Sequence, residues 1–367
     1  MELLYIGFVL FILVLLALDL GVFHRKAHVV SVREALGWST LWIGLGLAFT
    51  IFVYFGYEHH WLGLGTNPDA TSLAPNAGEG VTYYNDGGSA AIKYLTGFVV
   101  EKSLAVDNIF VIAMIFASLH VPAIYQHRVL FWGIVGALLM RGVMIAVGAA
   151  LIAKFSWTIY VFGAFLILTG VKMLLVKSQH GDFEKNILVR AVRRLFPVTE
   201  RYHGEKFVVR AGSAASLAPA EPGAPVEHDG VVAAAKRGAL LATPLFLALV
   251  LVEFTDVIFA VDSIPAIFAV TTDTFLVFTS NVFAILGLRS LYFALAGMID
   301  RFKYLKVSLS LVLMIIGVKM MTHGWLEAWL GAHFNFYVLA VVATTIAVGV
   351  VVSLLATRTD RPVPHAV

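Results

Sequence analysis

The sequence contains no cysteine. The chain therefore has no disulfide bonds, no thiolate metal ligands and no thiol redox chemistry of its own, although the absence of cysteine does not identify a compartment. The sequence also lacks the HExxH, GxSxG, Walker A and Rossmann fingerprints, which counts against a protease, a hydrolase or a nucleotide-driven pump. We therefore expect a protein that is not an enzyme and that needs no cofactor.

Charged residues are scarce as well, at 13% of the 367 residues, whereas hydrophobic residues make up 60%. This balance is far more apolar than that of a soluble domain. Crossing the hydrocarbon core of a bilayer takes about 20 apolar residues per helix. Such stretches occur at residues 3–22, 36–57, 90–118, 129–153, 157–176, 239–270, 274–297, 304–322 and 335–356. The predicted fold class is an all-α polytopic membrane protein with about nine transmembrane helices, and the lipid bilayer is its first expected partner.

Lys and Arg residues are distributed unequally between the two sets of loops. Alternate loops on one side hold 19 of them, and the other side holds only Lys93 and Lys154. Because positively charged loops stay in the cytoplasm, we expect an inner-membrane protein with its N-terminus outside and its C-terminus inside. The sequence pI near 9.0 is explained by these loops, so no nucleic acid partner is expected.

The hydropathy pattern divides the chain into six segments. Residues 1–57 hold two helices, residues 58–89 form an outer loop, and residues 90–176 hold three helices, which we term repeat A. Residues 177–237 form a basic cytoplasmic loop that includes a stretch rich in Ala, Pro and Gly at 211–230, which we expect to be disordered. Residues 238–322 hold three further helices, termed repeat B, and residues 323–367 hold the last helix and a cytoplasmic tail.

The names repeat A and repeat B reflect an internal match. EKSLAVDNI from Glu101 aligns with DVIFAVDSI from Asp256, Arg141 aligns with Arg289, and GVKM occurs at both Gly170 and Gly317. Each copy spans three helices, so the second copy enters the membrane from the opposite side. Inverted repeats of this kind place a transporter's substrate site near the midplane, between the paired helices.

Carboxylates occur at that predicted midplane. Each charge at the bilayer centre costs about 2.5 to 3.5 kcal/mol, so five of them cost on the order of 15 kcal/mol. Protonation, pairing with intramembrane cations, or a bound metal ion would offset this cost, and we favour a bound metal ion over an ionic lock because five carboxylates outnumber three cations. The cations are Lys102, Arg141 and Arg289.

The donor set contains only oxygen atoms, because no histidine or cysteine lies within the predicted spans. Such a set suits manganese, magnesium or calcium and argues against copper and zinc. Straight helices would separate the donors by about 120° around each axis, so either both faces are buried in protein or the helices unwind near the motifs, where Gly97 and Pro265 lie. The predicted metal-binding residues are Glu101, Asp107, Asn108, Glu253, Asp256, Asp262, Ser263, Asn281 and Asp19.

The same stretches resemble the TerC/Alx family of integral membrane proteins. The resemblance is carried by VEKSLAVDNIFV (100–111), YVFGAFLILTGVKM (160–173) and the long run from Ala242 to Phe293. It implies a manganese(II) exporter in a group named for tellurium resistance and related to the lysine-exporter superfamily. It also implies roles for Glu101, Asp107, Glu253, Asp256 and Asp262 in the site.

We therefore expect export of a divalent metal ion, Mn²⁺ before others, driven by a gradient through alternating access. Two alternatives stay open: an exporter of a cationic organic solute such as lysine, and a membrane scaffold that recruits partners for metal or tellurium stress through its basic loop. The sequence leaves the choice among Mn²⁺, Ca²⁺ and Mg²⁺, the coupling ion and the oligomeric state undetermined.

Overall fold

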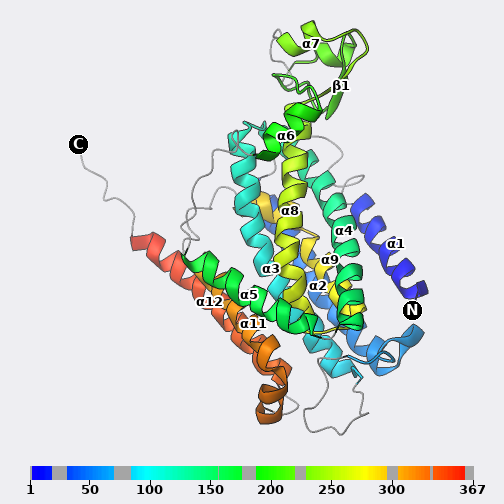
Figure 1. The fold of residues 1–367 in the computed structure, drawn as a ribbon, viewed down its shortest axis with the longest axis vertical. Helices are drawn as coiled ribbons and strands as arrows, with labels where there is room; N and C mark the ends of the chain where they lie inside the picture. The colour runs from blue at the N-terminus through cyan, green and yellow to red at the C-terminus, as the bar shows by residue number, and fades with distance from the viewer. Residues whose placement is uncertain are drawn as a thin grey trace.

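The computed structural model describes residues 2–18, 31–69, 84–155, 157–175, 187–219, 229–295, 305–330 and 334–359. They form a bundle of long helices with a small unit at one end (Figure 1). The bundle consists of α1 (Glu2–Leu18), α2 (Val32–Glu58), α3 (Gly87–Ser118), α4 (Ala123–Lys154), α5 (Thr158–Leu175), α8 (Pro244–Phe268), α9 (Thr274–Ile285), α10 (Leu288–Leu295), α11 (Leu305–Leu330) and α12 (Phe334–Thr359). The predicted all-α class is confirmed.

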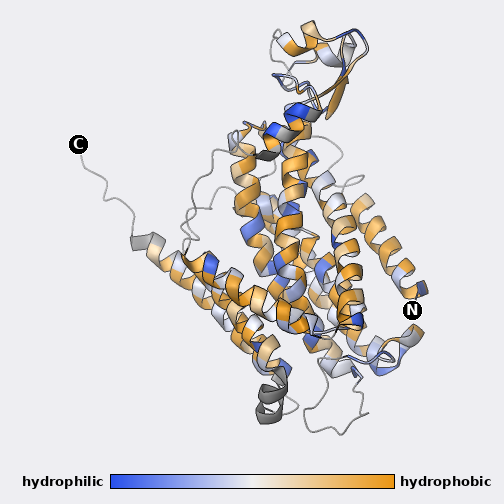
Figure 2. Ribbon diagram, viewed as in Figure 1, coloured by the Kyte–Doolittle hydropathy of each residue, from blue (hydrophilic) through white to orange (hydrophobic). Residues whose placement is uncertain are grey.

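The outside of the bundle is apolar (Figure 2). Large hydrophobic side chains are exposed along its helices, among them Leu10, Leu139, Leu168, Val318 and Val351. A continuous apolar coat of this kind is tolerated when lipid rather than water surrounds the helices. The surface therefore supports the same conclusion as the composition, an integral membrane protein.

Each predicted span coincides with one long helix, or with the pair α9 and α10. Five helices, α2, α4, α5, α8 and residues 335–353 of α12, are long and apolar enough to cross a membrane, and the bent pair makes a sixth. Helix α1 is apolar but its described part is only 17 residues long, and α3 carries the charged motif. A total of nine crossings stays a prediction.

Successive spans reverse direction through the bundle (Figure 1). Helix α1 begins at the end opposite the small unit, and α12 ends on the side of that unit. That the two termini lie on opposite sides of a membrane stays a prediction. Which side is cytoplasmic stays a prediction from the positive loops.

The two GVKM motifs lie on α5 and α11, which pack against each other. Glycine permits this approach, because a Cβ built at Gly163 lies 3.1 Å from the Gly317 carbonyl oxygen, and one built at Gly170 lies 2.8 Å from the Ser310 carbonyl oxygen. Helix α3 packs on α9 as α8 packs on α4, and α3 also contacts α8. These pairings are those expected of two inverted copies, so they support the predicted repeat.

The small unit comprises described residues 187–219 and 229–243. It contains α6 (Ile187–Leu195), β1 (Val208–Arg210), η5 (Ala214–Leu217), α7 (Gly230–Ala234) and β2 (Leu240–Ala242), with β1 and β2 antiparallel. Ala211 is buried against Val209 and Leu241, so the start of the stretch 211–230 has an apolar cluster to pack on. The disorder of that stretch stays a prediction. Residues 220–228 lie outside the described part of the chain.

Candidate functional site

A buried arginine lies at the centre of the bundle. Arg141, in the middle of α4, is 2% exposed and forms an ion pair with Glu101 of α3. Its Nη2 donates to Asp256 Oδ1 at 3.1 Å and its Nε to Oδ2 at 3.3 Å. Its Nη1 also lies 3.1 Å from Asn281 Oδ1 and 3.5 Å from Ser263 Oγ. We call these five residues the Arg141 cluster. It unites four of the predicted site residues from α3, α8 and α9.

A cavity of about 50 Å³ adjoins this cluster. It lies between α3 and α8, with α4, α5 and α11 closing it. The Asp262 carboxylate at its wall accepts a hydrogen bond from the Thr169 hydroxyl at 3.4 Å. The polar side chains that line the cavity are Glu101, Asp107, Asn108, Arg141, Thr169, Asp262 and Ser263. Five of the predicted metal-binding residues therefore share one cavity.

Two oxygen atoms of these lining residues are buried without a hydrogen-bond partner. They are Glu101 Oε2 and Asn108 Oδ1, which contact no donor among the residues that the structure describes. Both atoms only accept hydrogen bonds, and buried acceptors are rarely left unsatisfied in native proteins. Carbonyl and carboxylate oxygens are also the ligands that hard divalent cations prefer. The chemistry of the cavity wall therefore fits a cation.

The size of the cavity restricts what it holds in this conformation. A water molecule occupies roughly 30 Å³ in the liquid, so about 50 Å³ leaves space for an ion with one or two waters. Sites for drug-sized molecules measure about 300 to 1,000 Å³. The cavity suits a largely dehydrated ion better than an organic solute.

The helices remain continuous at the two acidic motifs. α3 passes unbroken through Glu101 and Asp107, and α8 passes through Asp262 even though Pro265 lies inside it. Of the two sequence alternatives, burial of both faces is therefore the one observed, and unwinding at Gly97 or Pro265 is wrong. Several helices cover the acidic motifs, because α3 packs on α2, α8, α9 and α12, and α8 packs on α3, α4 and α5.

The helix break lies elsewhere, between α9 and α10. Gly287 has a φ of 79° at this point, a value that residues with a side chain rarely adopt. Lys102 donates to the carbonyl oxygens of Ala284 at 2.8 Å and Leu286 at 3.0 Å. Carbonyls at a helix end lack intrahelical partners and carry partial negative charge. Lys102 thus caps a broken helix rather than pairing with a carboxylate.

The other described residues of the predicted set, Glu253, Asp256 and Asn281, do not line the cavity between α3 and α8. Glu253 contacts Gly136 of α4 so closely that a Cβ at that glycine would overlap its carboxylate. Asp256 borders a second cavity of about 20 Å³ beside Gly133 and Ala137. Asp19 lies outside the described residues. Within the described ranges, no group of three Asp, Glu or His side chains is placed to hold a metal ion together.

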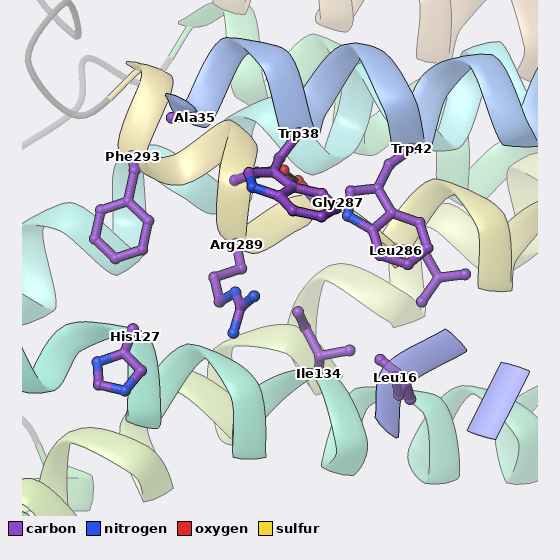
Figure 3. Close-up of a pocket in the computed structure, with 11 residues that line it drawn as sticks. Leu16, Ala35, Trp38, Trp42, His127, Ile134, Leu286, Gly287, Arg289 and Phe293 are labelled. Carbon is purple, nitrogen blue, oxygen red and sulfur yellow. Dashed lines mark hydrogen bonds between the residues drawn. The ribbon is translucent and has the colours of Figure 1, made fainter. Parts of the chain in front are cut away.

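The repeat counterpart of Arg141 occupies different surroundings. Arg289, on α10, points into a separate cavity of about 20 Å³ that Trp38, Trp42 and His127 also line (Figure 3). It does not enter the Arg141 cluster. The two copies of the repeat therefore supply unequal cations to the centre, which the alignment of the two arginines did not indicate.

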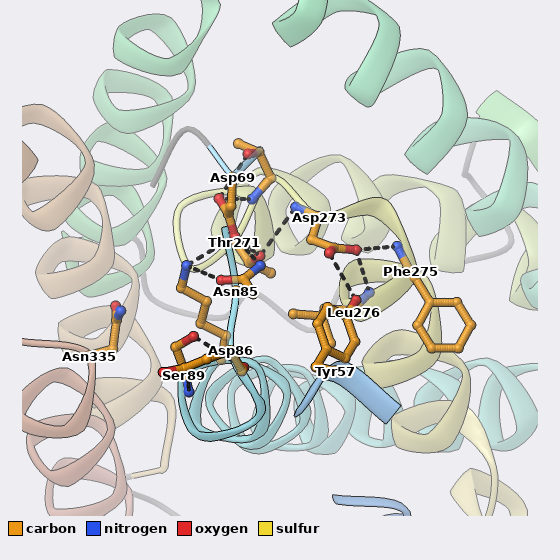
Figure 4. Close-up of polar contacts among 12 residues, drawn as sticks. Tyr57, Asp69, Asn85, Asp86, Ser89, Thr271, Asp273, Phe275, Leu276 and Asn335 are labelled. Carbon is orange, nitrogen blue, oxygen red and sulfur yellow. Dashed lines mark hydrogen bonds and ion pairs between the residues drawn. The ribbon is translucent and has the colours of Figure 1, made fainter. Parts of the chain in front are cut away.

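Sequence reasoning missed a second buried ion pair, which joins Lys93 near the start of α3 to Asp69 (Figure 4). Lys93 Nζ lies 3.0 Å from Asp69 Oδ2, and both side chains are 0% exposed. Asn85 donates to the same oxygen at 3.0 Å, and the Thr272 backbone N–H and hydroxyl donate to Oδ1 at 3.0 and 2.9 Å. Thr271 completes this Asp69 cluster through its hydroxyl. The distribution of Lys and Arg between loops treats Lys93 as a loop residue, and nothing in the hydropathy pattern links it to Asp69.

The Asp69 cluster keeps its carboxylate ionised. Burial by itself raises the pKa of Asp69, but the Lys93 ammonium, the Thr271 hydroxyl and the hydrogen bonds from Thr272 and Asn85 together hold that pKa well below its ordinary value. Tyr57 adds a neighbouring link by donating to Asp273 Oδ2 at 2.8 Å. These contacts join the loop after α2 to the loop between α8 and α9.

Comparison with known proteins gives consistent relatives. An uncharacterized membrane protein of Myxococcus xanthus is 47% identical over 86% of this chain and 82% of its own length. Proteins named "Putative membrane-bound redox modulator Alx" are 41% identical in Salmonella typhi, over 94% of both chains, and 42% identical in Escherichia coli, over 87% of this chain and 85% of the relative. No solved structure matches the chain.

The family model described as the integral membrane protein TerC family matches residues 86–361. This range begins at the first residue before α3 and includes both acidic motifs, the Arg141 cluster and the cavity. It confirms the resemblance seen in the motifs. The chain therefore belongs to the TerC family of integral membrane proteins.

Proposed function

We propose that the protein exports divalent metal ions from the cytoplasm, with Mn²⁺ as the main substrate. The observation that carries the proposal is the cavity between α3 and α8, which Asp107 and Asp262 line together with Glu101 and Asn108. Glu101 and Asn108 each also have one buried oxygen atom without a hydrogen-bond partner among the described residues. A cation supplies what these acceptors lack. The preference for Mn²⁺ within the group of oxygen-binding ions rests on the family resemblance.

The proposed binding step uses donors from both predicted repeats. Asp107 and Asn108 come from α3, and Asp262 and Ser263 come from the equivalent positions of α8. A relative movement of the two helices would change the spacing of these donors, and with it the affinity for the ion. Alternating access by rocking of the two repeats follows from this arrangement.

The driving force in this proposal is an ion gradient. Carboxylates bind metal in their ionised form, so binding releases any protons they carry. Proton exchange at Asp107 and Asp262 would couple metal export to the proton gradient. The proposal therefore predicts that a pH gradient changes the rate of metal flux.

Three other functions have less support. An organic cation such as lysine is larger than the cavity of about 50 Å³ admits in this conformation. A redox role, which the name of the Alx relatives mentions, would have to proceed without thiol chemistry in this chain, which has no cysteine. A scaffold would recruit its partners through the small unit. This unit is joined to α4 by the ion pair between Arg128 and Glu205.

The test is metal transport by the purified protein in proteoliposomes, comparing Mn²⁺, Ca²⁺, Mg²⁺ and lysine with and without a pH gradient. We expect Mn²⁺ flux in the wild type and a loss of at least about 100-fold in Asp107→Asn and in Asp262→Asn, because each removes a charged ligand. Asp86→Asn is the matched control. It makes the same change on α3, where Asp86 caps the helix, and asparagine caps equally well.

Wild-type Mn²⁺ flux that persists in both cavity variants would remove the cavity from the transport path. Lysine flux that exceeds metal flux would favour the organic-cation alternative. Flux that depends on the small unit but not on Asp107 or Asp262 would favour the scaffold.

A further inference from the structure

Arg141 occupies the place where oxygen donors of three helices converge. Its guanidinium contacts Glu101 from α3, Asp256 and Ser263 from α8, and Asn281 from α9. All four partners present oxygen atoms, and all four belong to the residues predicted to bind metal. A guanidinium here does what a bound cation would do, because it satisfies several oxygens at once.

The same guanidinium explains why the carboxylates do not converge further. It lies between Glu101 and Asp256, on facing helices, and bonds to both. An arginine stays protonated under all ordinary conditions. Arg141 therefore stays charged, and its charge leaves the site only when its side chain moves.

A small cavity beside Asp256 lies in the direction of such a movement. The second cavity, of about 20 Å³, is bordered by Ala137 and Gly133, one and two turns before Arg141 on α4. Side chains on a helix lean toward its N-terminus, so this cavity lies on the side toward which the Arg141 side chain extends. Because about 20 Å³ is less than the roughly 30 Å³ of one water molecule, a shift of the guanidinium in this direction also requires the side chains around the cavity to move.

Other described cations near the centre have different surroundings. Lys172 and Lys306 lie near enough to Asp262 and Asp107 to interact with them electrostatically, whereas the ion pair with Glu101 is formed by Arg141. Lys102 caps the carbonyl groups at the end of α9, and Arg289 lines the separate cavity of Figure 3. Arg141 is thus the cation of the described residues that is positioned to alternate with a bound ion at Glu101.

We propose that Arg141 is a tethered cation that replaces the transported ion when the site is empty. An arriving metal ion displaces the guanidinium from Glu101, and the guanidinium returns after the ion leaves. This proposal rests on the proposed export function and adds its return step. Without a substitute charge, the empty carrier would have to rearrange around uncompensated buried carboxylates, a costly state that slows its return.

The test separates binding, exchange and net transport in Arg141→Gln. Because the guanidinium competes for the same oxygens, removing it should tighten Mn²⁺ binding by about tenfold, measured by calorimetry in detergent. Exchange of Mn²⁺ across proteoliposomes loaded with Mn²⁺ on both sides should stay within about threefold of wild type, while net efflux should fall at least about tenfold. Arg141→Lys keeps a charge and should recover part of the net efflux.

Arg128→Gln is the matched control, because it makes the same substitution at the end of the same helix, where Arg128 is half-exposed and pairs with Glu205. It should change neither the affinity nor the ratio of exchange to net efflux. Thermal unfolding and gel filtration establish that each variant is folded.

Three results would overturn the inference. If Arg141→Gln weakens Mn²⁺ binding, or reduces exchange and net efflux equally while the wild type transports, Arg141 has a structural or ligand-orienting role and the export function survives. If Arg141→Lys is folded but behaves like Arg141→Gln in every assay, charge replacement is not its role. If the wild type neither binds nor transports Mn²⁺, the proposed function fails, and the inference fails with it.

Discussion

The molecule contains two buried ionic clusters that are built differently. In the Asp69 cluster, one carboxylate faces one ammonium, and both of its oxygens receive several hydrogen bonds. In the Arg141 cluster, one guanidinium serves two carboxylates, Glu101 Oε2 has no donor, and a cavity with two further carboxylates adjoins it. A saturated cluster stabilises one conformation, whereas an incompletely satisfied one has capacity to bind.

The largest effect on stability is expected at the saturated cluster. Lys93→Met removes the cation and leaves the Asp69 carboxylate buried without its counter-charge, which should lower the free energy of unfolding by about 3 to 5 kcal/mol. Unfolding of the purified protein in mixed micelles by increasing SDS measures this. Lys154→Met is the control at the same end of the bundle, because Lys154 is exposed and should contribute less than about 1 kcal/mol. A loss below about 1 kcal/mol in Lys93→Met would contradict the comparison.

A smaller loss is expected at the helix break that supports the Arg141 cluster. Lys102→Met leaves the carbonyl groups of Ala284 and Leu286 without their donor, which should cost about 1 to 3 kcal/mol. The same unfolding assay applies. Lys154→Met, which removes an exposed lysine at the end of α4, provides the comparison. Equal losses in the two variants would show that lysine removal in general, and not the cap, is responsible.

The cavity should respond in the opposite direction. Asp107→Asn removes a charge that is half-buried beside an unsatisfied oxygen, so stability should stay unchanged or rise by up to about 1 kcal/mol while metal flux is lost. Asp69→Asn makes the same substitution in the saturated cluster and should destabilise the protein. If Asp107→Asn destabilises as much as Asp69→Asn, the two clusters have the same structural role and the contrast drawn between them is wrong.

The smallest effect concerns pH. Because the pKa of Asp69 is held below its ordinary value, its contribution to stability is complete above the unfolded pKa, about 3.9, and is lost as the pH falls below that value. Between pH 8 and about pH 5 the difference in unfolding temperature between wild type and the double variant Asp69→Asn/Lys93→Met should therefore stay constant. A difference that changes steadily through this range would assign Asp69 a higher pKa.

Much of the architecture could be predicted from hydropathy and spacing. The apolar runs predicted the position of each long helix. The matching spacing of Glu101 and Asp107 in one motif, and of Asp256 and Asp262 in the other, predicted that the two helices meet, and α3 does contact α8. The residues of the cavity could also be predicted, because charged groups in apolar helices are few. Disorder of 211–230 is predicted from composition alone and stays a prediction, because composition does not reveal the apolar cluster around Val209 on which Ala211 packs.

Other features could not be predicted, because they depend on distances between segments far apart in the chain. Nothing in the sequence distinguishes Arg141, which enters the central cluster, from its counterpart Arg289, which does not. The pairing of Asp69 with Lys93 and Thr271 joins three segments whose hydropathy gives no sign of contact. The position of the helix break also depended on Gly287 rather than on Pro265.

The sequence by itself determined that the chain is a helical membrane protein with carboxylates at matching positions of two helices, because hydrophobicity and helical period are local properties. Only the tertiary structure decided which of those carboxylates meet a cation and which face a cavity. Charge compensation depends on distances of a few ångströms between helices, and these distances are fixed by packing across the whole bundle.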